Sequence, residues 1–135
     1  MMRQEEIKMF LFKKKKEKAA KEEAVPEISR EELLKKAEAI QKELPDLSGE
    51  ERNKALNELG SLYFEAEETD KAIRAYETSL SESKALGKAY TDLLKLYNIK
   101  RREASEAKDD AKMKEYMDKI DGLMKLSKDV IRGKA

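Results

Sequence analysis

Apolar residues recur every three or four positions along most of this chain, which is the spacing of one face of an α-helix. The pattern predicts helices over residues 1–24, 29–44, 48–67 and 69–86, and two more within residues 87–132. Alanine, leucine, glutamate and lysine dominate, and all four favour helices. We therefore expect an all-α protein of five to six helices, with a basic N-terminal helix or tail over residues 1–28 and a helical domain over residues 29–135.

The stretch from residue 55 to residue 80 carries the clearest pattern in the chain. It holds two apolar stripes separated by a short polar break; their members are Leu56, Leu59, Gly60 and Tyr63, then Ala72, Ile73 and Tyr76. Two such stripes indicate a pair of antiparallel helices packed closely together. Gly60 and Ala72 are both small, so we expect them to meet where the two helices approach.

Several polar residues are placed where they would begin or end a helix. Ser29 with Glu32, and Ser48 with Glu51, have the spacing of a capping box, in which each residue bonds to a free backbone N–H of the other. The remaining helix starts are expected at Thr69 or Asp70, and at Asp109 and Asp110. Gly87 suits the position after a helix that needs a positive φ.

Three methionines, Met113, Met117 and Met124, lie at core spacing in the last predicted helix. We interpret them as core residues that fill gaps, although methionine-rich faces also occur at adaptable binding surfaces. The inward positions of the same helix are expected at Tyr116, Ile120 and Leu123.

The pattern over residues 53–86 resembles a tetratricopeptide repeat, a helix–turn–helix unit of about 34 residues. Leu59, Gly60 and Tyr63 match its Leu, Gly and Tyr positions, and Ala72 and Tyr76 match its Ala and aromatic positions. The departures are Leu56 for tryptophan, Ser79 for a second small alanine, and Lys84 for the closing proline. Residues 87–132 resemble a second hairpin with longer helices, which carries Tyr90, Leu93, Leu94 and Tyr97 one repeat further on. The resemblance implies stacked antiparallel hairpins that form a short α–α superhelix.

In that family, the first helices of successive units line a groove that holds an extended peptide or a partner helix. The resemblance therefore implies a set of partner-binding residues: Lys54, Asn57, Ser61, Phe64, Lys88, Thr91, Lys95 and Asn98. The set is polar and contains three lysines, so it suits an acidic segment or a terminal carboxylate. The alternative is that these are ordinary exposed helix residues.

The segment from Met9 to Lys16 places aromatic residues beside four consecutive lysines. We favour docking of Ile7, Phe10 and Leu11 on the helical body or on a second copy of the chain. A mobile tail is the next interpretation. Contact with an anionic membrane is the least favoured, because stable anchoring needs more than one short run of this kind. No nucleic-acid partner is expected, since the basic clusters are interleaved with glutamates.

Charged residues make up 44% of the chain, and cysteine, histidine and tryptophan are absent. The chain therefore has no thiolate or imidazole for a metal site or for general-base catalysis, and we expect no metal, no cofactor and no enzymatic activity. No signal-peptide pattern is seen and the apolar runs are short, so a soluble, cytoplasmic protein is expected.

Two functions follow as alternatives. The first is a non-enzymatic adaptor or scaffold that binds a peptide or helix of a partner protein. The second is a structural module that associates with copies of itself and binds no external peptide.

Overall fold

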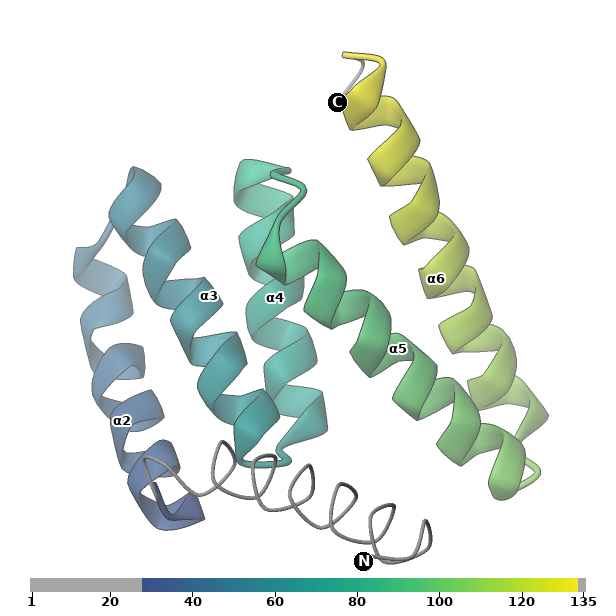
Figure 1. Cartoon of the computed structure of the whole chain (residues 1–135), viewed down its shortest axis with the longest axis horizontal. Helices are drawn as coiled ribbons and strands as arrows, with labels where there is room; N and C mark the ends of the chain where they lie inside the picture. Colours follow the sequence, from purple (N-terminus) through teal and green to yellow (C-terminus); the bar gives the residue numbers. More distant parts are fainter. Residues whose placement is uncertain (1–27, 134–135) are drawn as a thin grey trace, which may run out of the picture.

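The computed structural model describes residues 28–133, and these residues form only helices and their connections (Figure 1). The elements are α2 (Arg30–Glu43), a short 3₁₀ helix η1 (Leu44–Asp46), α3 (Gly49–Glu65), α4 (Thr69–Ser83), α5 (Lys88–Glu106) and α6 (Asp110–Ile131). The all-α prediction is confirmed for this part of the chain. The helix or tail predicted over residues 1–28 lies almost wholly outside the described residues.

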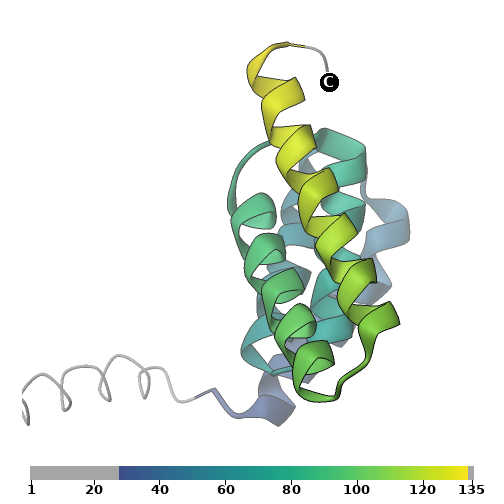
Figure 2. The ribbon, with the colours of Figure 1, turned by 90° about the vertical axis from the view of Figure 1, so that its right-hand side faces the viewer.

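Successive helices run antiparallel and lie side by side in chain order (Figures 1 and 2). Each packs on the helix before it and the helix after it, so α4 is covered by α3 on one side and by α5 on the other. One apolar cluster runs through these contacts from Leu33 on α2 to Leu123 on α6. Because the helices follow one another in a row, α6 stands at one end and packs along α5, while its Lys119 side chain reaches Glu77 on α4.

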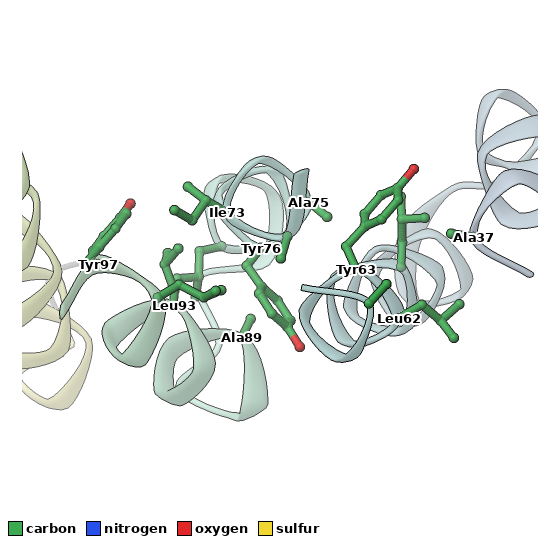
Figure 3. Close-up of a cluster of buried hydrophobic side chains, with 14 of the residues drawn as sticks. Ala37, Leu62, Tyr63, Ile73, Ala75, Tyr76, Ala89, Leu93 and Tyr97 are labelled. Atoms are coloured by element: carbon green, nitrogen blue, oxygen red, sulfur yellow. The ribbon is translucent and has the colours of Figure 1, made fainter. Parts of the chain in front are cut away.

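The α3–α4 hairpin is built around Gly60, as the sequence predicted, but the side chain next to Gly60 is Tyr76 rather than Ala72. A Cβ placed on Gly60 would lie 2.7 Å from Cε1 of Tyr76. Tyr76 is fully buried, and Figure 3 shows its ring extending from α4 toward Ala89 on α5. The missing side chain of Gly60 therefore leaves room for an aromatic ring from the facing helix.

Two of the predicted helix starts are confirmed. The Ser29 hydroxyl accepts a hydrogen bond from the Glu32 backbone N–H at 3.2 Å, and the Asp109 carboxylate accepts one from the Lys112 backbone N–H at 3.0 Å. Both satisfy an N–H that has no partner within the helix.

At the other two, the predicted capping bond is wrong. Ser48 precedes α3 but its side chain makes no capping bond, because Gly49 has a φ of +59° and turns the backbone away from helical geometry. α4 begins at Thr69, but its N-cap is Glu68 and not Thr69 or Asp70, and Glu68 too makes no side-chain capping bond.

Gly87 was also expected to end a helix with a positive φ, and this is wrong. It has a φ of −139° and begins α5 instead. The helix before it ends earlier, at Ser83, and the left-handed residue is Lys84 with a φ of 55°. The backbone N–H of Lys84 still bonds to the Leu80 carbonyl at 2.8 Å, so the helix end is closed without a glycine.

The prediction that the α6 methionines are core residues is wrong for two of the three. Tyr116 and Leu123 are buried against the body, as predicted, whereas Met117 and Met124 are 48% and 47% exposed. Each methionine follows a buried residue directly, and one residue is about 100° of rotation around a helix. That rotation carries the two methionine side chains away from α5.

A polar cluster joins α4, α5 and α6. The Tyr97 hydroxyl donates a hydrogen bond to the Glu77 carboxylate, and the Lys119 ammonium binds the same carboxylate at 3.0 Å. The Lys119 ammonium also lies 5.6 Å from the centre of the Tyr97 ring. Three successive helices therefore meet at one carboxylate, which fixes their relative positions.

Candidate functional site

The residues predicted to bind a partner lie on two helices that both pack on α4 and that touch each other along a short stretch. We call their common surface the α3–α5 face; its members are Lys54, Asn57, Ser61 and Phe64 on α3, and Lys88, Thr91, Lys95 and Asn98 on α5. Lys54, Lys88, Thr91 and Lys95 are exposed, and the other four are half-buried. The structure thus allows half of the set to meet a partner freely.

Asn57 is engaged inside the α3–α4 hairpin. Its side-chain oxygen accepts a hydrogen bond from the Ser79 hydroxyl at 2.6 Å, and its Nδ2 donates to Oδ1 of Asn53 at 3.3 Å. Asn53 in turn donates to the Ser79 hydroxyl at 2.9 Å. Ser79 is only 1% exposed, so this closed network satisfies a buried hydroxyl. Asn57 therefore has a structural task in addition to any role in binding.

On α5, two of the predicted residues already have partners within the helix. The Asn98 side chain donates to the Leu94 carbonyl at 3.0 Å. The Lys88 ammonium lies 3.7 Å from Oδ2 of Asp92, but its side chain is 60% exposed. Such an exposed ion pair is weak and leaves Lys88 able to turn to another anion.

Asp92 is a residue of the face that the sequence analysis missed. Its Oδ2 accepts a hydrogen bond at 2.7 Å from the Tyr76 hydroxyl, which reaches this point from α4, and its side chain is only 13% exposed. A signal was present, because Asp92 stands three residues after Ala89 and four before Leu96, at the edge of the buried stripe of α5. A carboxylate in that place needs a donor from the neighbouring helix.

The environment of the Tyr76 hydroxyl favours its neutral form. Burial, followed by the hydrogen bond to Asp92, raises the pKa of Tyr76 far above its usual value, while the nearby Ser61 hydroxyl acts in the opposite direction. Tyr76 therefore stays a hydrogen-bond donor at neutral pH, and it holds the Asp92 carboxylate in place between α3 and α5.

Two of the surface hollows are larger than about 700 Å³. One, of about 710 Å³, lies between α2, α3 and α4; its floor includes Leu56, Leu59 and Tyr63, and its rim includes Lys71 and Arg74. The floor side chains are already buried, which leaves little apolar surface for a ligand. The other, of about 740 Å³, lies where α3 begins and α4 ends, and Lys54 is the one predicted binding residue that lines it.

Residues 28–133 contain no group of three acidic side chains arranged to hold a metal ion. Within the same residues, no helix has the length and apolar character needed to cross a bilayer. The predictions made for residues 9–16, docking, a mobile tail or membrane contact, concern a segment that the structure does not describe.

Comparison with protein-family models, with curated proteins and with solved structures finds no match for this chain. The resemblance to the tetratricopeptide repeat therefore stays a prediction from the sequence.

Proposed function

We propose that this protein is a tetratricopeptide-like adaptor that binds an acidic peptide segment of a partner protein through the α3–α5 face. Antiparallel hairpins that stack in chain order support the proposal, because such stacks present their helices side by side to an elongated ligand. We also propose a soluble, cytoplasmic protein, because the apolar runs of the chain are short.

The observation that carries the proposal is the arrangement of lysines around the Tyr76–Asp92 hydrogen bond. Lys88 and Lys95 are seven residues apart on one side of α5, and both are exposed. Lys54 is exposed on α3. The buried Tyr76 hydroxyl holds the carboxylate of Asp92 at 2.7 Å, so the acidic member of the face is fixed while its lysines are free to move. Lysine ammonium groups on flexible stems suit carboxylates whose exact orientation varies.

The test is selection of peptides from a random library on the full chain, followed by affinity measurements with the peptides obtained. We expect acidic sequences whose affinity falls as salt rises. The double variant Lys88→Glu with Lys95→Glu should weaken them by about tenfold or more, since two attractive contacts become repulsive.

A matched control is Lys35→Glu with Lys36→Glu on α2. Both lysines are exposed, and Lys35 lies 3.9 Å from Glu31 in an ion pair like that of Lys88. The control changes the net charge equally but leaves the α3–α5 face intact. Selected peptides that bind both double variants with equal affinity, or a selection without acidic peptides, would contradict the proposal.

The alternative function, a module that associates with its own copies, draws on another surface. The α3–α5 face is polar, whereas three of the four exposed large apolar side chains in residues 28–133 lie on α6.

A further inference from the structure

The outer side of α6 carries an apolar stripe. Met117, Met124 and Ile131 are seven residues apart, and they are 48%, 47% and 77% exposed. Ile120 lies between Met117 and Met124, Met113 lies four residues before Met117, and both Met113 and Ile120 are half-buried. We call these five residues the α6 stripe. From Met113 to Met124 the spacing alternates between four and three, which is that of a helix that packs against another helix, and Ile131 follows one heptad later.

No described element covers Met117, Met124 and Ile131, whereas Ile120 packs in part against the core. α6 packs along α5 on the side of Tyr116 and Leu123, and its Lys119 reaches Glu77 on α4. Figure 2 shows α6 at the end of the row of helices, in front of the others. Large exposed apolar patches on small proteins mark interaction surfaces. Methionine suits such a surface because its flexible side chain adapts to the opposing residues.

We propose that the α6 stripe pairs with the α6 stripe of a second copy of this chain, with the two helices antiparallel. A two-fold axis between Asp118 and Lys119 places Met117 against Ile120 of the second copy. The same axis places Met113 against Met124 of the second copy. Because a two-fold interface repeats every contact, these four residues of each copy are all paired.

The charges beside the stripe fit the same register. Lys114 and Asp121 flank the stripe on one edge. In the proposed antiparallel register, Lys114 of each copy lies opposite Asp121 of the other copy, so the dimer has two such pairs. Lys114 lies 3.5 Å from Asp118 in its own helix, but its side chain is 80% exposed, so this ion pair is weak and Lys114 is able to turn to a second copy. Opposite charges at flanking positions of this kind determine which partner and which orientation a helix accepts.

Other arrangements of the two helices are less favourable. Moving one helix by a heptad sets Asp121 against Asp121 and Lys114 against Lys128, which are like-charge contacts. A parallel pair sets Lys114 and Asp121 beside Tyr116 and Leu123, which offer no charge. The antiparallel register that buries the methionines is therefore also the one that pairs opposite charges. A second copy of the chain supplies both an apolar stripe and the charges that match Lys114 and Asp121. The inference is independent of the α3–α5 face.

The first experiment is sedimentation equilibrium of the full chain over a concentration series. We expect a monomer–dimer equilibrium, and we expect Met117→Asp to raise the dimer dissociation constant by about 100-fold or more, because each dimer would bury two unpaired charges. Leu86→Asp is the matched control, since Leu86 is an exposed apolar residue between α4 and α5, off the stripe. It should leave the dissociation constant unchanged, and circular dichroism should show the same helicity for all three chains.

The second experiment is a charge exchange, which does not disturb the apolar contacts. Lys114→Glu alone and Asp121→Lys alone should each weaken the dimer by about tenfold, and the double variant should restore it. A monomer at every concentration overturns the proposal and leaves the stripe to another occupant, such as residues 1–27 of the same chain. A dimer that is insensitive to Met117→Asp, or a double variant no tighter than the single ones, overturns it equally.

Discussion

At the scale of single residues, Gly60 shows how one absent side chain determines a helix pair. Its would-be Cβ lies 2.7 Å from Cε1, and 2.8 Å from two further ring carbons, of a Tyr76 that is completely buried. We expect Gly60→Ala to lower the free energy of unfolding by about 1–2 kcal/mol, because the cost of overpacking exceeds the gain in helix propensity. Urea unfolding of the full chain measures this change.

Gly122 provides the control for that measurement. It also lies inside a helix, α6, but nothing comes within 4 Å of a Cβ placed on it. Gly122→Ala should therefore raise the free energy of unfolding by about 0.5–1 kcal/mol through propensity alone. If both glycines respond in the same direction, the contact with Tyr76 does not decide the role of Gly60.

Asn57 carries the second prediction at this scale. Asn57→Ala removes the acceptor of the buried Ser79 hydroxyl, and we expect a loss of about 1–3 kcal/mol in the free energy of unfolding. Adding Ser79→Ala should return part of the loss, since in Asn57→Ala the buried hydroxyl keeps the Asn53 donor but has lost the acceptor for its own proton. If the double variant is as unstable as the sum of the single ones, the bond between the two side chains does not stabilise the hairpin.

At the scale of the helices, the sequence predicted which stretches are helical better than it predicted how they end. Helix interiors follow from local spacing, which is why the stripes of α3 and α4 were found where the structure has them. Helix ends depend on one or two backbone angles. Three connections use a residue other than glycine in the left-handed region, at Glu67, Lys84 and Lys108. A prediction that looks for glycine at helix ends selects Gly87, but Gly87 is the N-cap of α5.

Two of these helix ends are built alike. After α3, the Glu68 N–H bonds to the Tyr63 carbonyl at 2.8 Å; after α5, the Asp109 N–H bonds to the Ala104 carbonyl at 2.8 Å. Each bond spans the left-handed residue and closes the last turn of its helix. The two hairpins thus turn in the same manner, although residues of opposite charge, Glu67 and Lys108, occupy the left-handed position.

The candidate site was accessible to sequence reasoning only in part. Exposed lysines such as Lys88 and Lys95 are recognised from their position on the polar side of a stripe. The hydrogen bond between Asp92 and Tyr76 was not, because it joins residues on different helices and depends on the distance between α4 and α5. The exposure of Met117 and Met124 was missed for the same kind of reason: spacing alone does not tell how many neighbours a helix has.

At the scale of the whole molecule, two buried tyrosines link the packing of the helices to pH. The Tyr76 hydroxyl donates to Asp92, and the Tyr97 hydroxyl donates to Glu77. Burial, and next the hydrogen bond to the carboxylate, raises the pKa of both tyrosines well above the ordinary value. The folded chain therefore keeps the hydroxyl protons of Tyr76 and Tyr97 at a pH, above about 10, at which the unfolded chain releases them.

Stability should consequently decrease in alkali. Above about pH 10 the unfolded chain loses protons from Tyr76 and Tyr97 while the folded chain retains them, so the free energy of unfolding falls as pH rises. Each tyrosine contributes at most about 1.4 kcal/mol per pH unit, and the pair contributes about 2 kcal/mol between pH 10 and pH 11, because the unfolded tyrosines are only half ionised at about pH 10. Below that range the contribution of both tyrosines is fully present. Urea unfolding at a series of pH values from 8 to about 11.5 measures the slope.

The double variant Tyr76→Phe with Tyr97→Phe separates this effect from other alkaline changes. It loses two hydrogen bonds and is less stable at neutral pH, so the slope and not the level of stability is compared. We expect the slope above about pH 10 to become shallower by roughly the contribution of two tyrosines, and each single variant to account for about half. A double variant with the slope of the original chain would mean that the hydroxyls ionise equally in both states, and that the contacts with Asp92 and Glu77 do not hold their protons.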